Sequence, residues 1–316
     1  MIREMKTRHP GECQQSLCRA LGVSRQAHHK QGRRLARVLQ GEQQVVQRVR
    51  SIRAEQPRLG GLKLYSTLRE HIQQLPVPFG RDKFFDLLGR EGLLLRTRKR
   101  RVRTTWSGHG LQVYPDLVKG MVLERPGQVW VSDITYWAVE DGFHYIFLIS
   151  DLCSHKIIGH QVAMDMGGEH ALAALRMAQR NAAHPLQGII HHSDRGSQYC
   201  YRAYVQALKV AGMRLSMTQT SDPRDNAVAE RLNGILKNEL LAHHHVSNIA
   251  QAKRLLDQAV RIYNSKRPHL SCDMMVPDQA HQLTDKPRRR WKSYYRTVNP
   301  IQEQTTIVNP KQEERL

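Results

Sequence analysis

The feature that most constrains the fold is the alternation of strand and helix patterns that begins at Gln128. Runs rich in β-branched and aromatic residues come first and predict three strands, at 129–137, 144–150 and 156–162. Helical patterns and short extended runs then alternate, with helices predicted at 171–183, 199–211, 226–241 and 249–263 and strands at 188–192 and 214–218. This order predicts a mixed α/β sheet with helices packed on its faces.

The chain carries a large positive charge, most of it in the first 120 residues. It contains 49 Lys and Arg against 28 Asp and Glu in 316 residues, a formal net charge of +21. Residues 1–120 hold 25 basic and 9 acidic residues, and residues 121–316 hold 24 and 19. Such an excess predicts attraction to a polyanion, most commonly nucleic acid. A basic region before a nearly balanced one is typical of a DNA-binding region attached to a catalytic core.

Composition also excludes several classes of protein. With 40% hydrophobic residues the chain can bury a core, which excludes global disorder. Apolar runs fall short of a membrane span, and the charged amino terminus leads into no apolar segment, so neither a membrane protein nor a secretory signal is expected. The five cysteines form no CxxC pair. They predict neither a disulfide framework nor a structural zinc site, and a reduced cytoplasmic compartment is expected.

The basic half is predicted to be helical. Residues 17–25 have the pattern of a helix, a glycine turn and a second helix capped by Ser24, which fits a helix-turn-helix segment within residues 1–40 or any two short helices. Residues 41–95 are predicted to form a helical DNA-binding domain with helices near 43–55, 61–73 and 81–91. The apolar residues of its third helix are expected in the core, namely Phe84, Phe85, Leu87 and Leu88.

A basic run separates the helical half from the predicted sheet, within a linker at 96–123. It is predicted to bind DNA phosphates, with a solvated linker as the alternative, through Arg96, Arg98, Lys99, Arg100, Arg101 and Arg103. The catalytic core is predicted at 124–285, and the basic tail at 286–316 is expected to be loosely ordered.

Three carboxylates carry the prediction of chemistry. Asp133 interrupts a strand that otherwise has a buried pattern, and an unpaired buried charge costs several kcal/mol, on the order of magnitude known for charge burial. Asp194 follows a second apolar strand, where α/β sheets bind ligands. Glu230 lies on a predicted helix, on the side opposite its apolar stripe and with Asn226, Asn233, Gly234 and Lys237. Any one of the three acidic residues alone would fit a cap, a turn or a surface charge, so only the combination is specific.

Carboxylates in this number suit magnesium. Mg²⁺ prefers oxygen ligands and takes one or two carboxylates together with substrate phosphates. Two such ions about 4 Å apart can activate an attacking oxygen and stabilise the leaving oxygen in phosphodiester cleavage. The histidine runs at 191–192 and 243–245 lack zinc spacing with a cysteine pair. Glu239 points away from Glu230 and is expected to be solvated, and Asp151 is expected to begin a turn.

Four motifs resemble one known family, the second-frame (OrfB) transposases of bacterial insertion sequences, which have a retroviral-integrase-type catalytic core. The resemblance spans about residues 17–277, and its most specific segments are 130–136, 192–199, 225–237 and 263–270 with Pro277. Asp194 and Glu230 are separated by 35 residues, the interval of this family. His155, where the family commonly has arginine, and Ser221-Asp222, in place of Gly-Asn, depart from its pattern.

The resemblance implies a ribonuclease-H-like fold preceded by an all-α basic region. It also implies that Asp133, Asp194 and Glu230 are the DDE ligands of two Mg²⁺ ions, with Mn²⁺ as a substitute, and that Lys237 and Asn226 contact DNA. The implied activity is cleavage at element ends and transfer of the 3′-hydroxyl into DNA. Homo-oligomerisation on DNA, a first-frame (OrfA) partner or fusion, and a bacterial nucleoid location are implied as well. A non-catalytic DNA-binding regulator and a ribonuclease of the same fold remain alternatives.

Overall fold

The structure is a computed structural model, and it describes residues 5, 7, 10–95, 113–140, 142–219, 227–242, 244–288 and 290. Three predictions from the sequence lie outside the described residues: the basic run at 96–103, the DNA contact at Asn226 and the order of the tail beyond residue 290. None of the helices in the described ranges is both long and apolar enough to cross a lipid bilayer.

The described part of the chain begins with a helix-turn-helix arrangement. Helix α2 (Gln14–Ala20) ends in a turn where Gly22 has a φ of 65°, a conformation that costs glycine little. Helix α3 (Arg25–Glu55) follows, and the Ser24 side chain caps it by accepting from the Ala27 N–H at 3.0 Å. The predicted order of helix, glycine turn and capped helix is confirmed. The second helix is long and runs through residue 40, where the sequence predicts a division between two segments.

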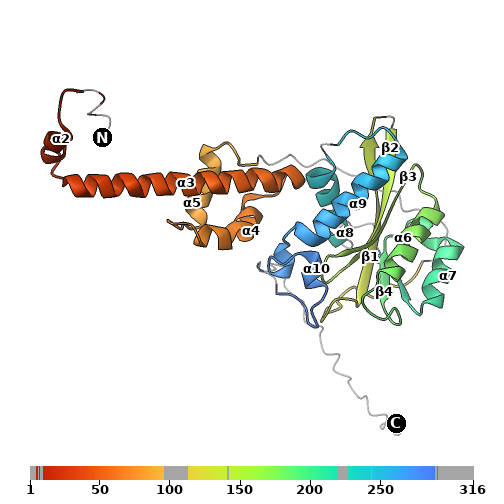
Figure 1. The fold of residues 1–316 in the computed structure, drawn as a ribbon. Coiled ribbons are helices and arrows are strands. Elements are labelled where there is room, and N and C mark those ends of the chain that lie inside the picture. The colour runs from red at the N-terminus through yellow and green to blue at the C-terminus, as the bar shows by residue number, and fades with distance from the viewer. Residues whose placement is uncertain are drawn as a thin grey trace, which may run out of the picture.

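Two further helices complete the amino-terminal region. Helices α4 (Gly61–Gln73) and α5 (Arg81–Arg90) pack with the carboxyl-terminal half of α3. Their apolar faces form one buried cluster with the valines of α3, and it includes Phe84, Leu87 and Leu88, as predicted. The amino-terminal half of α3 projects away from this cluster (Figure 1).

The second region is built on a five-stranded mixed sheet in the order β3-β2-β1-β4-β5. Its strands lie close to the predicted runs, at β1 (Val129–Val139), β2 (Gly142–Asp151), β3 (Ile157–Ala163), β4 (Ile190–Ser193) and β5 (Arg214–Met217). The β1–β2 and β2–β3 pairs are antiparallel, whereas β1–β4 and β4–β5 are parallel. The first three strands therefore form a meander, and the last two are added by helical crossovers.

Helices cover both faces of the sheet (Figure 1). On one face lie α6 (Gly168–Arg180), the 3₁₀ turn η1 (Ser197–Cys200) and α7 (Arg202–Val210). On the other lie α8 (Ala227–Ile235), its π-helical continuation η3 (Leu236–Leu240) and α9 (Ile249–Lys266). The chain then forms η4 (Leu270–Cys272) and α10 (Pro277–Ala280). The predicted α/β fold with flanking helices is confirmed, and the predicted helix at 199–211 divides at Tyr201 into η1 and α7.

The end of α9 contacts the helical region. Lys266 forms an ion pair with Glu55 of α3, and the Gln56 side chain donates to the Lys266 carbonyl at 3.4 Å. Nearby, Arg267 is almost fully buried and binds Glu239 through two guanidinium nitrogens at 2.9–3.0 Å. The prediction that Glu239 is solvated is therefore wrong, because the chain after α9 brings a buried arginine to it.

Candidate active site

Asp133 and Asp194 lie at the same edge of the sheet, on two neighbouring parallel strands. The β1–β4 register pairs Ser132 with Ser193, and each aspartate is the next residue of its chain. In the described structure β4 ends at Ser193, whereas β1 continues to Val139. Asp133 and Asp194 therefore lie next to each other where β4 ends, at the side of an α/β sheet that leaves a crevice for ligands.

Asp133 is buried, with 8% of its surface exposed, and a side chain from α8 binds it. The Asn233 amide donates to Asp133 Oδ2 at 2.6 Å, and the Ile134 N–H donates to Oδ1 at 3.0 Å. Asn233 is itself 2% exposed. A buried carboxylate needs such donors, because its desolvation is otherwise uncompensated. The bond fixes α8 against the strand.

Glu230 reaches the same edge through this helix. It lies three residues before Asn233 in α8 and is half-buried. Residues three apart lie on one side of a helix, one turn from each other. The Asn233–Asp133 bond therefore places the Glu230 turn beside the two strand ends. Lys237 lies one turn beyond Asn233, in η3.

Tyr199 is a buried phenol near the two aspartates. It is 2% exposed and lies in η1, just after Asp194. Its burial, together with the charges of Asp194 and Asp133, raises the pKa of its phenol well above the usual value. Both carboxylates therefore lie near this buried ring, in agreement with their position at one edge of the sheet.

The three carboxylates are not among the compact groups of potential metal-ligating side chains in the described structure. Among the described residues, the sets of three potential metal-ligating atoms within 4.8 Å of one another are His155–His269–Cys272 and Asp165–Glu169–His170. The structure thus brings Asp133, Asp194 and Glu230 to one edge but not into a cluster of that radius.

The His155–His269–Cys272 set is better explained by packing. The two imidazole rings are stacked, with centroids 4.4 Å apart and planes at 18°. Because a metal ion lies in the plane of each imidazole that binds it, nearly parallel rings cannot share one ion without reorienting. The second set, Asp165–Glu169–His170, lies at the start of α6 and is largely exposed.

His191 and His192 have structural partners, in line with their weak metal spacing. His191 Nε2 lies 2.7 Å from the Tyr204 hydroxyl, and His192 Nδ1 lies 2.9 Å from the Ser216 hydroxyl. Burial lowers the pKa of His191 to about 3, so its ring is neutral in the core.

Lys237 is the one predicted DNA-contacting residue that lies among the described residues. Its ammonium donates to the Tyr136 carbonyl at 3.2 Å and lies 4.5 Å from the centre of the Tyr136 ring. This position is on β1 beyond Asp133, at the same edge as the carboxylates. Sequence reasoning missed the roles of Asn233 and Tyr136, although Asn233 was placed on the side of Glu230 by helical spacing.

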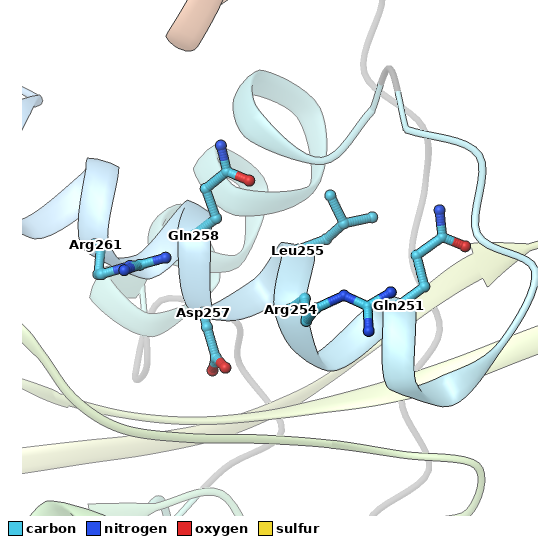
Figure 2. A pocket seen from close by; sticks show the side chains of 6 residues that line it. All are labelled: Gln251, Arg254, Leu255, Asp257, Gln258 and Arg261. Atoms are coloured by element: carbon cyan, nitrogen blue, oxygen red, sulfur yellow. The ribbon is translucent and has the colours of Figure 1, made fainter.

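A surface hollow lies elsewhere, along α9. Figure 2 shows its six lining side chains, all from this helix: Gln251, Arg254, Leu255, Asp257, Gln258 and Arg261. None of the three carboxylates lines it, and its polar side chains are spread along one helix rather than converging. It is therefore separate from the candidate active site.

A mixed sheet in this order, with carboxylates within β1, just after β4 and on a helix after β5, defines the ribonuclease-H-like class to which integrase cores belong. Residues 124–223 and 211–277 each match an integrase core domain family. The chain is 35% identical to an insertion element IS600 protein of 31 kDa from Shigella sonnei, over 68% of this chain and 81% of that protein. The chain therefore belongs to the insertion-sequence transposases with an integrase-type core.

Two further likenesses accompany these matches. The IS3A transposase InsF of Escherichia coli K12 is 29% identical over 84% of this chain and 92% of its own length. The HTLV-2 integrase catalytic core domain, solved in complex with magnesium, aligns with a TM-score of 0.41 and 16% identity over 50% of this chain and 97% of that one.

Proposed function

We propose that this chain is a DDE transposase that cleaves DNA at insertion-element ends and transfers the exposed 3′-hydroxyl into DNA. One observation carries the proposal: Asp133 within β1 and Asp194 just after β4 lie next to each other on adjacent parallel strands, and the Asn233–Asp133 bond holds the Glu230 helix against β1. Family membership supports the same reaction class.

The donor set fits a hard divalent cation. Two aspartates and a glutamate offer carboxylate oxygens at one edge of the sheet, and oxygen is the ligand atom that Mg²⁺ prefers. Asp133, Asp194 and Glu230 would hold Mg²⁺, with Mn²⁺ as a substitute. When bound, two such ions supply the positive charge that activates an attacking oxygen and stabilises the leaving one in phosphodiester chemistry.

Other side chains of the protein orient the carboxylates and bind the DNA. Asn233 orients the Asp133 carboxylate and keeps its charge hydrogen-bonded in a buried site. Lys237 lies in η3, one turn beyond Asn233, and is proposed to pair with a DNA phosphate. The basic residues at 96–103 and Asn226 are proposed to add phosphate contacts, with residues 1–95 as the main DNA-binding region.

The test is strand cleavage by the amide variants Asp133→Asn, Asp194→Asn and Glu230→Gln. Each should lose cleavage and strand transfer on a duplex that carries the terminal repeats flanking the gene, yet still bind that duplex. Asp257→Asn, an exposed carboxylate on α9, is the matched control and should cleave normally. Normal cleavage by any of the three amide variants would remove that residue from the proposed ligand set.

Two rival functions make different predictions. A regulator that only occupies element ends would bind DNA without metal-dependent cleavage. A ribonuclease would degrade the RNA strand of an RNA–DNA hybrid faster than it cuts an element-end duplex. Comparing the two substrates separates these outcomes. We also propose assembly as a homo-oligomer on DNA, with a first-frame partner or fusion, in the bacterial nucleoid.

A further inference from the structure

An exposed pair of aromatic side chains lies near the turn of the β1–β2 hairpin. Tyr136 is 52% exposed and Phe143 is 57% exposed. Their rings meet edge to face, with centroids 5.6 Å apart and planes at 89°. The neighbouring side chains Trp137 and His144, which point to the opposite face, are buried. The hairpin therefore has one packed face and one face on which large aromatic surface meets solvent.

Lys237 adds a positive charge to this pair. Its ammonium lies 4.5 Å from the centre of the Tyr136 ring and also donates to the carbonyl of the same residue. These contacts hold the cation beside the aromatic surface. An aromatic face with an adjacent basic side chain is the composition of sites that bind unpaired bases, because every base has a π face and is followed by a phosphate.

The pair lies around the edge of β1 from the proposed reaction centre. Tyr136 follows Asp133 by three residues in β1, about 10 Å along a strand, and its side chain points to the face of the sheet opposite the Asp133 carboxylate. Within the described structure, no strand pairs with this part of β1 on the β4 side, because β4 ends opposite Ser132. A DNA strand that crosses this unpaired edge of β1 from the carboxylate site would reach the aromatic pair within a few nucleotides of the reacting phosphate.

We propose that Tyr136 and Phe143 form a stacking platform for an unpaired base of the DNA strand whose phosphate lies at Asp133, Asp194 and Glu230. The proposal rests on the proposed function and names a nucleobase as the ligand. The position of the Lys237 ammonium beside the Tyr136 ring favours an anionic ligand over an apolar protein segment on this surface. Both residues are more than half exposed, so both rings have surface that a base can stack on.

The platform predicts a preference for unpaired DNA that depends on aromatic rings. The probes are a blunt duplex and the same duplex with a short single-stranded tail containing 2-aminopurine, whose fluorescence falls on stacking. The wild-type chain should bind the tailed duplex more tightly and quench its fluorescence. Phe143→Leu, which keeps apolar bulk but has no π face, should weaken tailed-duplex binding about 5- to 100-fold and relieve quenching.

Two further variants sharpen the test. Tyr136→Phe keeps the ring and should retain the preference for the tail, whereas Tyr136→Leu should reduce it. Val210→Ala trims an exposed apolar side chain on α7 and should have no effect. Because the substituted side chains are exposed, equal melting temperatures should accompany the changed binding.

Several results would overturn the platform. Equal tail preference and quenching in Phe143→Leu, Tyr136→Leu and wild type would exclude base stacking. A change of oligomeric mass in these variants, with tail binding intact, would instead make the pair a contact between copies. Asp133→Asn should keep the quenching and lose cleavage, so failure of the platform and failure of the proposed function give different results.

Discussion

Two buried aspartates in the sheet differ in how their charge is satisfied. Asp151 is fully buried at the end of β2 and accepts four hydrogen bonds within its own turn and from Gly127, at 2.7–3.1 Å. Asp133 accepts from Asn233, 100 residues away. The local bonds suit a structural role, whereas Asp133 lies at the ligand-binding edge of the sheet and depends on a helix that is brought to it.

Asn233 is expected to be a positioning residue. Asn233→Ala removes the 2.6 Å bond to Asp133 and should slow strand cleavage about 10- to 100-fold, as for other residues that orient metal ligands. DNA affinity should change little. The readout that distinguishes positioning from simple destabilisation is the magnesium dependence, which should shift to higher concentration. Unchanged cleavage and magnesium dependence would contradict this role.

Asp151 should matter for stability instead. Asp151→Ala leaves the N–H groups of Gly127, Cys153 and Ser154 without their acceptor in a buried turn. Each buried donor left unsatisfied costs about 1–3 kcal/mol, so unfolding by urea should shift strongly toward lower denaturant. Asp151→Asn retains one acceptor oxygen, so its stability should lie between those of the wild type and Asp151→Ala. Wild-type stability of Asp151→Ala would contradict the buried-turn argument.

At the scale of elements, the segment formed by α8 and η3 links the active site to the rest of the molecule. Its buried side packs on the sheet and α9 through leucines, as the sequence stripe predicts. Its polar positions reach three different partners: Asn233 binds Asp133, Lys237 contacts Tyr136, and Glu239 binds Arg267. The segment becomes π-helical at Leu236, and such turns are frequent at functional sites.

The Arg267–Glu239 pair should stabilise the attachment of this segment. Arg267 is 1% exposed, so Arg267→Met leaves Glu239 without its bidentate partner and should cost about 3–5 kcal/mol in urea unfolding. Arg267→Lys should recover part of this loss, since it keeps the charge but not the fork. The double variant Arg267→Met/Glu239→Met should lose less stability than the sum of the losses in Arg267→Met and Glu239→Met. Strict additivity would show that the residues are not coupled.

At the scale of the whole molecule, the helical region meets the core through a surface rich in cations. Lys63 of α4 is half-buried there, near Arg267, Arg231 and Glu239. Burial, then the charge of Arg267, lowers the pKa of Lys63 to about 7. Arg231 follows Glu230 directly in α8, so this junction lies next to the helix that carries Glu230.

The junction predicts a pH dependence with a definite sign. The Lys63 pKa is about 7 in the folded chain and 10.5 for an unperturbed lysine, so between these pH values the unfolded chain binds more protons. The free energy of unfolding should therefore rise with pH from about 7 toward 10.5. Lys63→Met should raise the melting temperature at pH 7 and flatten this rise. The same slope in wild type and Lys63→Met would contradict the assignment.

Local sequence patterns were enough to predict the element types, the fold class and the family. Runs of β-branched and aromatic residues and helical stripes are local patterns, and burial of the apolar side chains follows them, as in β1 and α8. Asp133 stood out within its own strand, because a charged residue conflicts with a buried pattern. These properties need only neighbouring residues to be recognised.

Tertiary structure alone decided which side chains meet. The Asn233–Asp133 and Arg267–Glu239 bonds, the stacked His155–His269 rings and the exposed Tyr136–Phe143 pair all depend on strand register and helix docking. Glu239 illustrates the limit, since its helical position correctly points away from Glu230 but cannot indicate an arginine 28 residues later. Such contacts are set by how whole elements pack, because packing fixes long-range distances that local sequence patterns do not contain.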